Sequence, residues 1–126
     1  MSEGLLQLLP MAKVGHVGIS RDPVTLEPWP YLCKLPDALA QRRILACDPM
    51  LATGGSAAAA IDLIKQHGGR DITFLCLLAA PEGVEHLHRL HPDIRIVVGH
   101  LDRGRNARGY VSPGFGNAGE RLFGAK

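Results

Sequence analysis

Three short apolar runs alternate with two helical segments in the middle of the chain. The runs cover residues 42–48, 72–80 and 94–101, and they read as buried strands. Residues 56–69 repeat apolar side chains near helical spacing, and residues 82–91 form a second helical segment that stops before a proline. A strand–helix–strand–helix–strand series places its strands in one parallel sheet. The sequence therefore predicts an α/β fold, a parallel sheet with flanking helices.

The chain before the first of these runs carries weaker signals. Apolar residues 5–9 form one helical turn that stops at a proline, and we interpret this turn as a buried helix rather than a docking motif. Residues 13–20 predict a strand, whereas the proline-rich residues 21–36 predict an irregular excursion. Trp29 and Tyr31 are expected to pack this excursion down or to line a subunit contact. A homo-oligomer is the state we expect.

Composition and charge argue against several classes of protein. At 126 residues, with 46% hydrophobic and 21% charged residues, the chain has the size and make-up of one soluble globular domain. A formal net charge of +2 offers little to a nucleic acid, and no apolar run approaches the roughly 20 residues that cross a bilayer. Cys33, Cys47 and Cys76 form no CxxC pair and predict reduced thiols. We expect a cytoplasmic protein with no nucleic-acid or membrane partner.

The stretch DPMLATGGS, residues 48–56, joins the first buried run to the first helix. Its glycines let the backbone approach an anion closely, and the helix N-terminus adds N–H groups and partial positive charge. Thr53 and Ser56 supply hydroxyl donors, and Asp48 can accept hydrogen bonds from sugar hydroxyls. A plain strand-to-helix turn with Ser56 as N-cap is the alternative. The stretch predicts an anion cradle at the carboxyl edge of the sheet.

Two other phosphate-binding motifs fit poorly. A Walker loop needs Lys directly before its Ser or Thr, but Ser56 follows Gly55 and the next lysine is Lys65. GFGNAG at residues 114–119 matches GxGxxG, yet no strand leads directly into it and no ribose-binding acid can follow. Nucleoside triphosphate hydrolysis and dinucleotide binding are therefore poorly supported.

Three histidines of the second helical segment invite a metal-site interpretation. On a helix, only His88 and His91 of this group share a face, and no acid or cysteine completes a tetrahedral set with them and His86. We interpret all three as solvated surface.

Residues after Asp102 lose regular periodicity and are rich in glycine until a possible helical turn near Glu120. A long irregular segment in a compact domain is more often functional than idle, so we expect a C-terminal flap.

Several stretches together resemble the successive motifs of the uracil phosphoribosyltransferase family across nearly the whole chain. Asp48-Pro49 with Met50 resembles the uracil enzymes, because related phosphoribosyltransferases usually carry two adjacent acids there. The matching stretches are DPMLATGGS, AAPEGVEHL, HPD, RGYVSPGFGNAGERLFG and RDPVTLEPWPYLCKLP.

This resemblance implies a type I phosphoribosyltransferase-like fold and the conversion of uracil and 5-phosphoribosyl-1-diphosphate to UMP and diphosphate. It also implies Mg²⁺ carried in by the diphosphate substrate, and regulation by GTP. As diphosphate leaves, positive charge builds on the sugar and negative charge on the leaving oxygens, so catalysis is mainly positioning and electrostatics. We expect no covalent nucleophile.

The resemblance also assigns the site residues. The ribose and 5′-phosphate would lie on the 48–56 loop, the diphosphate would meet Arg21, and Tyr110 would pack near the base. The implied phosphoribosyl diphosphate site is Arg21, Asp48, Pro49, Met50, Leu51, Ala52, Thr53, Gly54, Gly55, Ser56 and Asn117. The implied uracil site is Tyr110, Val111, Gly116, Asn117 and Ala118.

Two features depart from the family pattern. Asn117 and Glu120 stand where the family flap has Asp in a GDAGD pattern. Met1 aligns just inside the family's diphosphate-binding RAGLxM loop, so residues 1–126 are expected to form one phosphoribosyltransferase-like domain that is N-terminally incomplete. We therefore expect weak or absent catalysis by this chain alone. The alternative function is a catalytically silent truncated fragment, or a regulatory domain that binds phosphoribosyl ligands.

Overall fold

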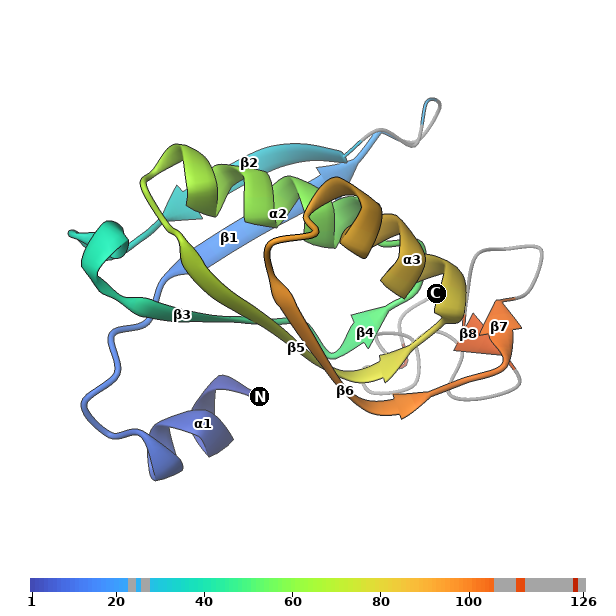
Figure 1. Cartoon of the computed structure of the whole chain (residues 1–126), viewed down its shortest axis with the longest axis horizontal. Helices are drawn as coiled ribbons and strands as arrows, with labels where there is room; N and C mark the ends of the chain where they lie inside the picture. Colours follow the sequence, from blue (N-terminus) through green and yellow to red (C-terminus); the bar gives the residue numbers. More distant parts are fainter. Residues whose placement is uncertain (23–24, 26–27, 106–110, 113–123, 125–126) are drawn as a thin grey trace.

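The computed structural model describes residues 1–22, 25, 28–105, 111–112 and 124. Its centre is a parallel sheet in which β5 (Asp71–Ala79) has neighbours on both sides (Figure 1). On one side lies β6 (Arg95–Leu101), and on the other lie β3 (Arg43–Cys47) and β4 (Met50–Leu51). The three predicted strands of the α/β series are confirmed.

The two-residue strand β4 was not predicted. It continues the line of β3 in one register, since Arg43 lies opposite Asp71 and Met50 lies opposite Leu78. Proline has no backbone N–H, so the regular hydrogen-bond ladder with β5 is interrupted at Pro49. The carbonyl of Pro49 still accepts hydrogen bonds from the amides of Leu77 and Leu78, at 3.2 and 3.1 Å. The strand line resumes and delivers the chain to the loop that follows.

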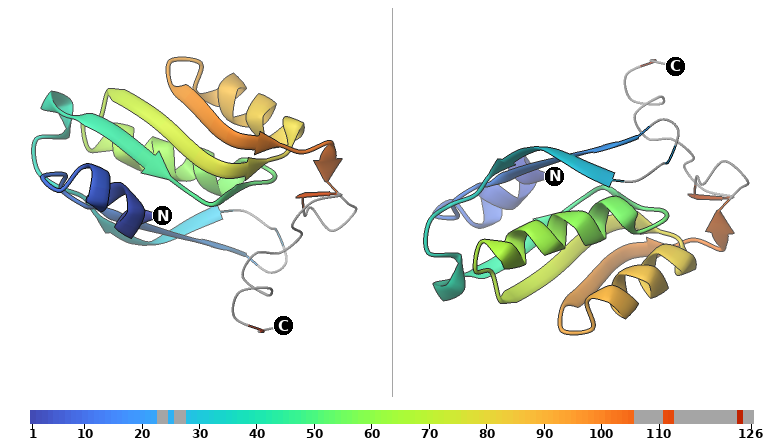
Figure 2. Two further views of the ribbon diagram at one scale, coloured as in Figure 1. Left: turned by 90° about the horizontal axis from the view of Figure 1, so that it is seen from below. Right: turned by 90° about the horizontal axis from the view of Figure 1, so that it is seen from above.

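Helices α2 (Gly55–Gln66) and α3 (Pro81–Leu90) cover one face of the sheet (Figure 2). Both predicted helices are confirmed, and α2 ends earlier than expected because Gly68 adopts the left-handed region with φ 91°. We call the covered face the inner face. Its buried cluster is Leu51, Ala57, Ala58, Ile61, Ile64, Ile72, Phe74, Cys76, Ala79, Leu87 and Ile94.

Alternate residues of the same strands point to the other side, which we call the outer face. Leu45, Leu77 and Val97 are 42%, 54% and 51% exposed there. Helix α1 (Ser2–Leu8) lies on this side of the sheet, away from α2 and α3, and none of its residues is buried. The predicted burial of this helix is therefore wrong: the covered face of the sheet is already filled by two longer helices.

The proline-rich stretch is also not the irregular excursion that its composition suggested. Strands β1 (His16–Arg21) and β2 (Pro28–Lys34) pair as a separate antiparallel ribbon beside α2. Prolines are tolerated here because β2 pairs with a single neighbour among the described residues. Gly18 of β1 lies under the ring of Tyr31, since a Cβ at Gly18 would sit 2.5 Å from that ring. The ring still remains exposed.

The remaining elements are short. A 3₁₀ turn covers Leu39–Gln41, and β7 (Gly104–Arg105) pairs antiparallel with β8 (Val111–Ser112). The predicted helical turn near Glu120 falls outside the described residues. None of the helices in the described segments combines the length and apolar character needed to cross a membrane.

His91 corrects the interpretation of the histidines as solvated surface. It is 4% exposed, because it follows α3 and turns back against α2. Its Nδ1 lies 3.1 Å from Nζ of Lys65 and its Nε2 lies 3.2 Å from the Ala58 carbonyl oxygen. An ammonium group can only donate, so Nδ1 accepts and Nε2–H donates. The imidazole therefore links the end of α3 to the middle of α2.

Candidate functional site

The predicted anion cradle occupies the turn between β4 and α2. Gly54 is the N-cap of α2, with φ 83° and ψ −12°, a conformation that glycine adopts without strain. The alternative with Ser56 as N-cap is wrong, since Ser56 lies inside the first helical turn. Thr53 Oγ1 lies 3.5 Å from the amide of Gly55. The turn thus places two hydroxyls beside the N-terminus of a twelve-residue helix.

Arg21 is brought to this turn from the end of β1. Its Nε donates to Ser56 Oγ at 3.3 Å, and its terminal nitrogen donates to Thr53 Oγ1 at 3.1 Å. The side chains that meet here are 35 and 32 residues apart in sequence. A guanidinium and the positive end of a helix dipole therefore lie together, which creates a field that favours an anion.

Asp48 lies at the break between β3 and β4, partly buried. Its Oδ1 accepts a hydrogen bond of 3.3 Å from the amide of Met50. Burial raises the pKa of the Asp48 carboxyl above 3.8, while the Met50 amide and the positive charge of Arg21 act in the opposite direction. Burial, with a smaller contribution from Asp48, raises the pKa of the Cys76 thiol to about 11. The thiol of Cys76 is therefore protonated at neutral pH.

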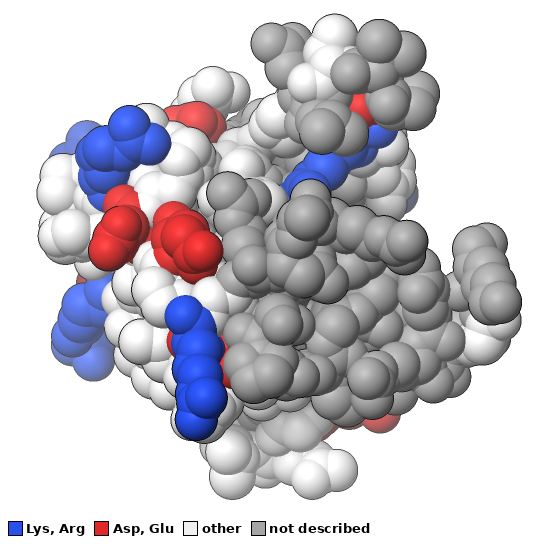
Figure 3. Space-filling view, turned by 90° about the vertical axis from the view of Figure 1, so that its right-hand side faces the viewer, with Lys and Arg blue, Asp and Glu red and all other residues white. Residues whose placement is uncertain are grey.

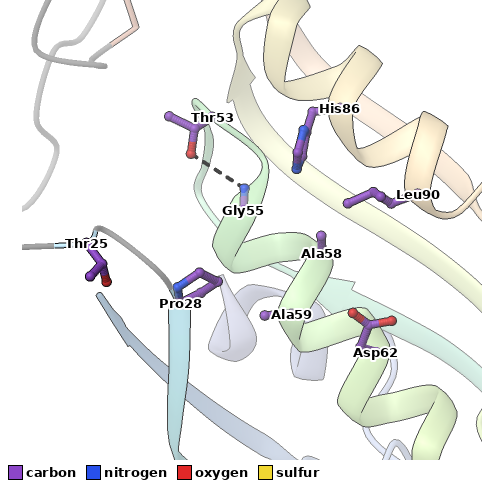
Figure 4. Close-up of a pocket in the computed structure, with 9 residues that line it drawn as sticks. All are labelled: Thr25, Pro28, Thr53, Gly55, Ala58, Ala59, Asp62, His86 and Leu90. Carbon is purple, nitrogen blue, oxygen red and sulfur yellow. Dashed lines mark hydrogen bonds between the residues drawn. The ribbon is translucent and has the colours of Figure 1, made fainter. Parts of the chain in front are cut away.

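A cavity of about 440 Å³ opens beside this turn, between α2, α3 and the start of β2 (Figure 4). The ring of His86 and the side chain of Leu90 reach toward it from α3, and the carboxylate of Asp62 lies farther along α2. Of the predicted site residues, Thr53 and Gly55 line this cavity and Asp48 does not. The full lining is Thr25, Pro28, Thr53, Gly55, Ala58, Ala59, Asp62, His86 and Leu90.

The parallel strands β4, β5 and β6 end toward the side of the molecule that faces the viewer in Figure 3. Lys or Arg and Asp or Glu side chains are interspersed on the described part of this face. Asp102 follows β6 there and is 8% exposed, with its carboxylate accepting a 2.9 Å bond from the Arg103 amide. Sequence reasoning missed this acid, although an acid directly after an apolar run is the signal that pointed to Asp48.

The implied uracil residues fall almost entirely outside the described part of the chain. Val111 belongs to β8, where it lies opposite Arg105. Tyr110, Gly116, Asn117 and Ala118 lie outside the described residues, so their roles stay predictions. Among the residues that are described, no group of three or more His, Cys, Asp or Glu side chains could hold a metal ion.

The architecture has a counterpart among solved structures. A purine phosphoribosyltransferase from Pyrococcus horikoshii matches 82% of this chain and 70% of its own with a TM-score of 0.58, at 18% identity. This likeness shows that the chain has a phosphoribosyltransferase-like α/β fold. The family model for uracil phosphoribosyltransferase matches residues 1–125, and the chain belongs to the uracil phosphoribosyltransferase family.

Individual relatives agree with this assignment. Uracil phosphoribosyltransferases of Thermoanaerobacter sp. strain X514 and Symbiobacterium thermophilum are each 55% identical over all 126 residues. The structure of the AQ2163 protein from Aquifex aeolicus matches with a TM-score of 0.89 at 38% identity, covering all of this chain and 60% of its own. The present chain also spans 60% of the length of the two curated relatives.

Proposed function

We propose that residues 1–126 form one phosphoribosyltransferase-like domain that works in uracil phosphoribosyl transfer. Uracil and 5-phosphoribosyl-1-diphosphate would be converted to UMP and diphosphate. The observation that supports the proposal most directly is that the guanidinium of Arg21 donates hydrogen bonds to the hydroxyls of Thr53 and Ser56 at the start of α2. Family membership supports uracil and phosphoribosyl diphosphate as the substrates, and this arrangement of charge and hydroxyls supports the binding of a phosphate group.

The turn suits a phosphate on electrostatic grounds. The first four amides of a helix have no partner within the helix, and they carry about half a positive charge. Arg21 adds a full positive charge, and the guanidinium N–H groups that do not bond to the two hydroxyls are left to donate to phosphate oxygens. Both hydroxyls accept from Arg21, so their own hydrogens are left to donate to an anion. The proposal assigns the 5′-phosphate to this turn and the ribose hydroxyls to Asp48.

The chemistry that follows is a displacement at the anomeric carbon of the ribose. The bond between that carbon and the diphosphate oxygen breaks with the electron pair going to diphosphate, a bond to N1 of uracil forms, and the proton of N1 passes to solvent. Mg²⁺ belongs to the diphosphate substrate in this proposal and neutralises charge on the leaving group. The domain holds the reactants in line, as positioning and electrostatic stabilisation require, without a covalent nucleophile.

The cysteines and the exposed aromatic side chains bear on the compartment and on the assembly of the protein. Cys33, Cys47 and Cys76 are all free, which favours a reducing compartment such as the cytoplasm. Trp29 and Tyr31 are 58% and 64% exposed on the β1–β2 ribbon, which favours a subunit contact and a homo-oligomer. Small-molecule substrates, and no nucleic-acid or membrane partner, complete the proposal. Regulation by GTP remains an expectation from the family.

Binding of the Mg²⁺ complex of phosphoribosyl diphosphate, and of UMP, tests the proposal by calorimetry. Replacing Arg21 by Gln should weaken binding about 10- to 100-fold, because hydrogen bonds to charged groups contribute roughly 1.5–3 kcal/mol. Arg95→Gln is the matched control, since Arg95 is exposed and paired with Asp71. Loss for both ligands assigns Arg21 to the 5′-phosphate, and loss for the diphosphate ligand alone assigns it to the diphosphate. Equal affinities in both variants would refute the site.

Turnover separates an enzyme from a silent binding domain. Conversion of radiolabelled uracil is measured with this chain and with a version extended by the family's N-terminal portion. We expect the extension to raise turnover by about 100- to 1000-fold, the cost of losing one preorganised donor, with UMP affinity nearly unchanged. If neither version converts uracil while both bind UMP, the silent binding domain is the better assignment.

A further inference from the structure

We propose that Gly83 of α3 is a positioning residue that sets the conformation of the turn at residues 52–54. Nothing in the family assignment or in the site residues above gives Gly83 a role. The inference deepens the proposed function, because this turn is where we place the 5′-phosphate. It rests on two backbone contacts between α3 and the turn.

The first contact is made possible by the missing side chain of Gly83. A Cβ at this position would lie 2.5 Å from the carbonyl oxygen of Ala52 and 2.9 Å from that of Leu51. Ordinary van der Waals contact begins at about 3.4 Å, and both neighbours are backbone atoms that cannot rotate away. Any other residue at Gly83 therefore forces α3 or the turn to move.

The second contact runs the other way. The carbonyl oxygen of Gly83 would lie 2.8 Å from a Cβ at Gly54, and Cδ2 of His86 would lie 3.2 Å from it. Gly54 also has φ 83°, which L side chains rarely adopt. Each glycine thus lets a carbonyl of the opposite segment approach closely. The Ala52 carbonyl lies against Gly83, and the Gly83 carbonyl lies against Gly54. The two segments fit as an interlocked pair rather than as independent loops.

A clash at Gly83 would move the turn at residues 52–54 more easily than it would move α3. Helix α3 is anchored by Leu87, which is fully buried, and the amide of Ala80 just before the helix bonds to the carbonyl of Leu51 at 2.9 Å. By contrast, Ala52 and Thr53 are partly exposed. A Cβ at Gly83 would shift the turn by several tenths of an ångström to about 1 Å, and a misplacement near 1 Å can cost about 100-fold in an active site.

The substitution Gly83→Ala tests this inference, with Gly4→Ala as its matched control. Both glycines are helical, and a Cβ at Gly4 would meet nothing within 4 Å. Gly to Ala at a compatible helical site stabilises a protein through the unfolded state. We therefore expect Gly4→Ala to hold or raise the melting temperature and Gly83→Ala to lower it.

Two further readouts separate positioning from general destabilisation. Amide hydrogen exchange of residues 51–57, measured without ligand, should accelerate at least tenfold in Gly83→Ala, while exchange in β5 changes far less. UMP affinity should fall at least tenfold, whereas the affinity for uridine, which lacks the phosphate, should stay constant. Loss of both affinities by the same factor would be the signature of a structural role alone.

The outcomes distinguish this inference from the proposed function. Wild-type exchange at residues 51–57 in Gly83→Ala overturns the inference, whichever ligands bind. Failure of the unmodified chain to bind UMP overturns the proposed function, and the exchange data still decide the role of Gly83. If Gly83→Ala does not fold, Gly54→Ala probes the same contact from the other side, and protected, wild-type-like exchange there also overturns the inference.

Discussion

The two faces of the parallel sheet are built from the same strands and differ in what covers them. On the inner face, Ile72 and Phe74 are each 2% exposed beneath α2 and α3. On the outer face, Leu77 and Val97 are 54% and 51% exposed. The residue types are equally apolar, so hydrophobicity alone does not decide burial. A face becomes a core only where another element lies against it.

This difference also decides where the candidate site can be rigid. Helix α2 starts at the glycine turn and buries Ala57, Ala58, Ile61 and Ile64 against the inner face. The N-terminal half of α2 is therefore held against the sheet by the buried cluster of the inner face. Among the described residues, no buried cluster supports the outer face in the same way, and the polar groups of the site lie at the edge of the inner layer.

The largest expected effect is in the inner face. Replacing Phe74 by Ala removes a side chain that is 2% exposed and leaves a cavity beneath the helices. Such a change costs about 3–5 kcal/mol of the free energy of unfolding. Urea denaturation followed by circular dichroism measures it. A loss below about 1 kcal/mol would mean that the two faces are equivalent after all.

A smaller loss is expected from the link between α2 and α3. Replacing His91 by Ala removes the buried donor to the Ala58 carbonyl and the part-buried acceptor for Lys65. Leaving a buried polar group without its partner costs about 1–3 kcal/mol. His88→Ala on the exposed side of α3 is the control, with an expected change within about 0.5 kcal/mol. Equal losses in urea denaturation would contradict this account.

The outer face should respond in the opposite way. Replacing the half-exposed Leu77 by Thr should change the free energy of unfolding by no more than about 0.5 kcal/mol, because little contact is lost. The same change should lower binding of the dye ANS, which reports exposed apolar surface. A large destabilisation by Leu77→Thr, close to that of Phe74→Ala, would show that the outer face is covered in solution.

The smallest effect concerns the pH dependence set by Asp48. Burial raises the pKa of this carboxyl above 3.8, so the folded state holds its proton more tightly than the unfolded state. The stability from this term is present below the unfolded pKa and is lost as pH rises through the folded pKa. The Asp48→Asn variant has no carboxyl to ionise and does not lose this stability. The melting temperature of the variant minus that of the wild type should therefore increase as pH rises from 3.8. If this difference decreases with rising pH, the pKa of Asp48 is lowered by folding and the account is wrong.

Local patterns predicted the central layer well. Alternation and helical spacing located β3, α2, β5, α3 and β6, since each of these elements buries a continuous apolar face or run. The same reasoning failed for residues 28–34, where prolines suggested a loop but a two-stranded ribbon formed. It failed again for α1, which is rich in leucine like a buried helix. No other layer covers α1 among the described residues, and none of its residues is buried.

What the sequence determined by itself is the order of the central strands and helices, from β3 to β6 apart from β4, and the glycine turn, because backbone freedom at Gly54 and apolar periodicity are properties of single segments. The tertiary structure alone decided which face of the sheet became the core, and it decided that Arg21 meets Thr53 and Ser56. It also decided the close approach of Gly83 to Ala52. Contacts between segments far apart in sequence depend on how whole layers pack. The local preferences of a segment contain no information about which distant segment it will contact.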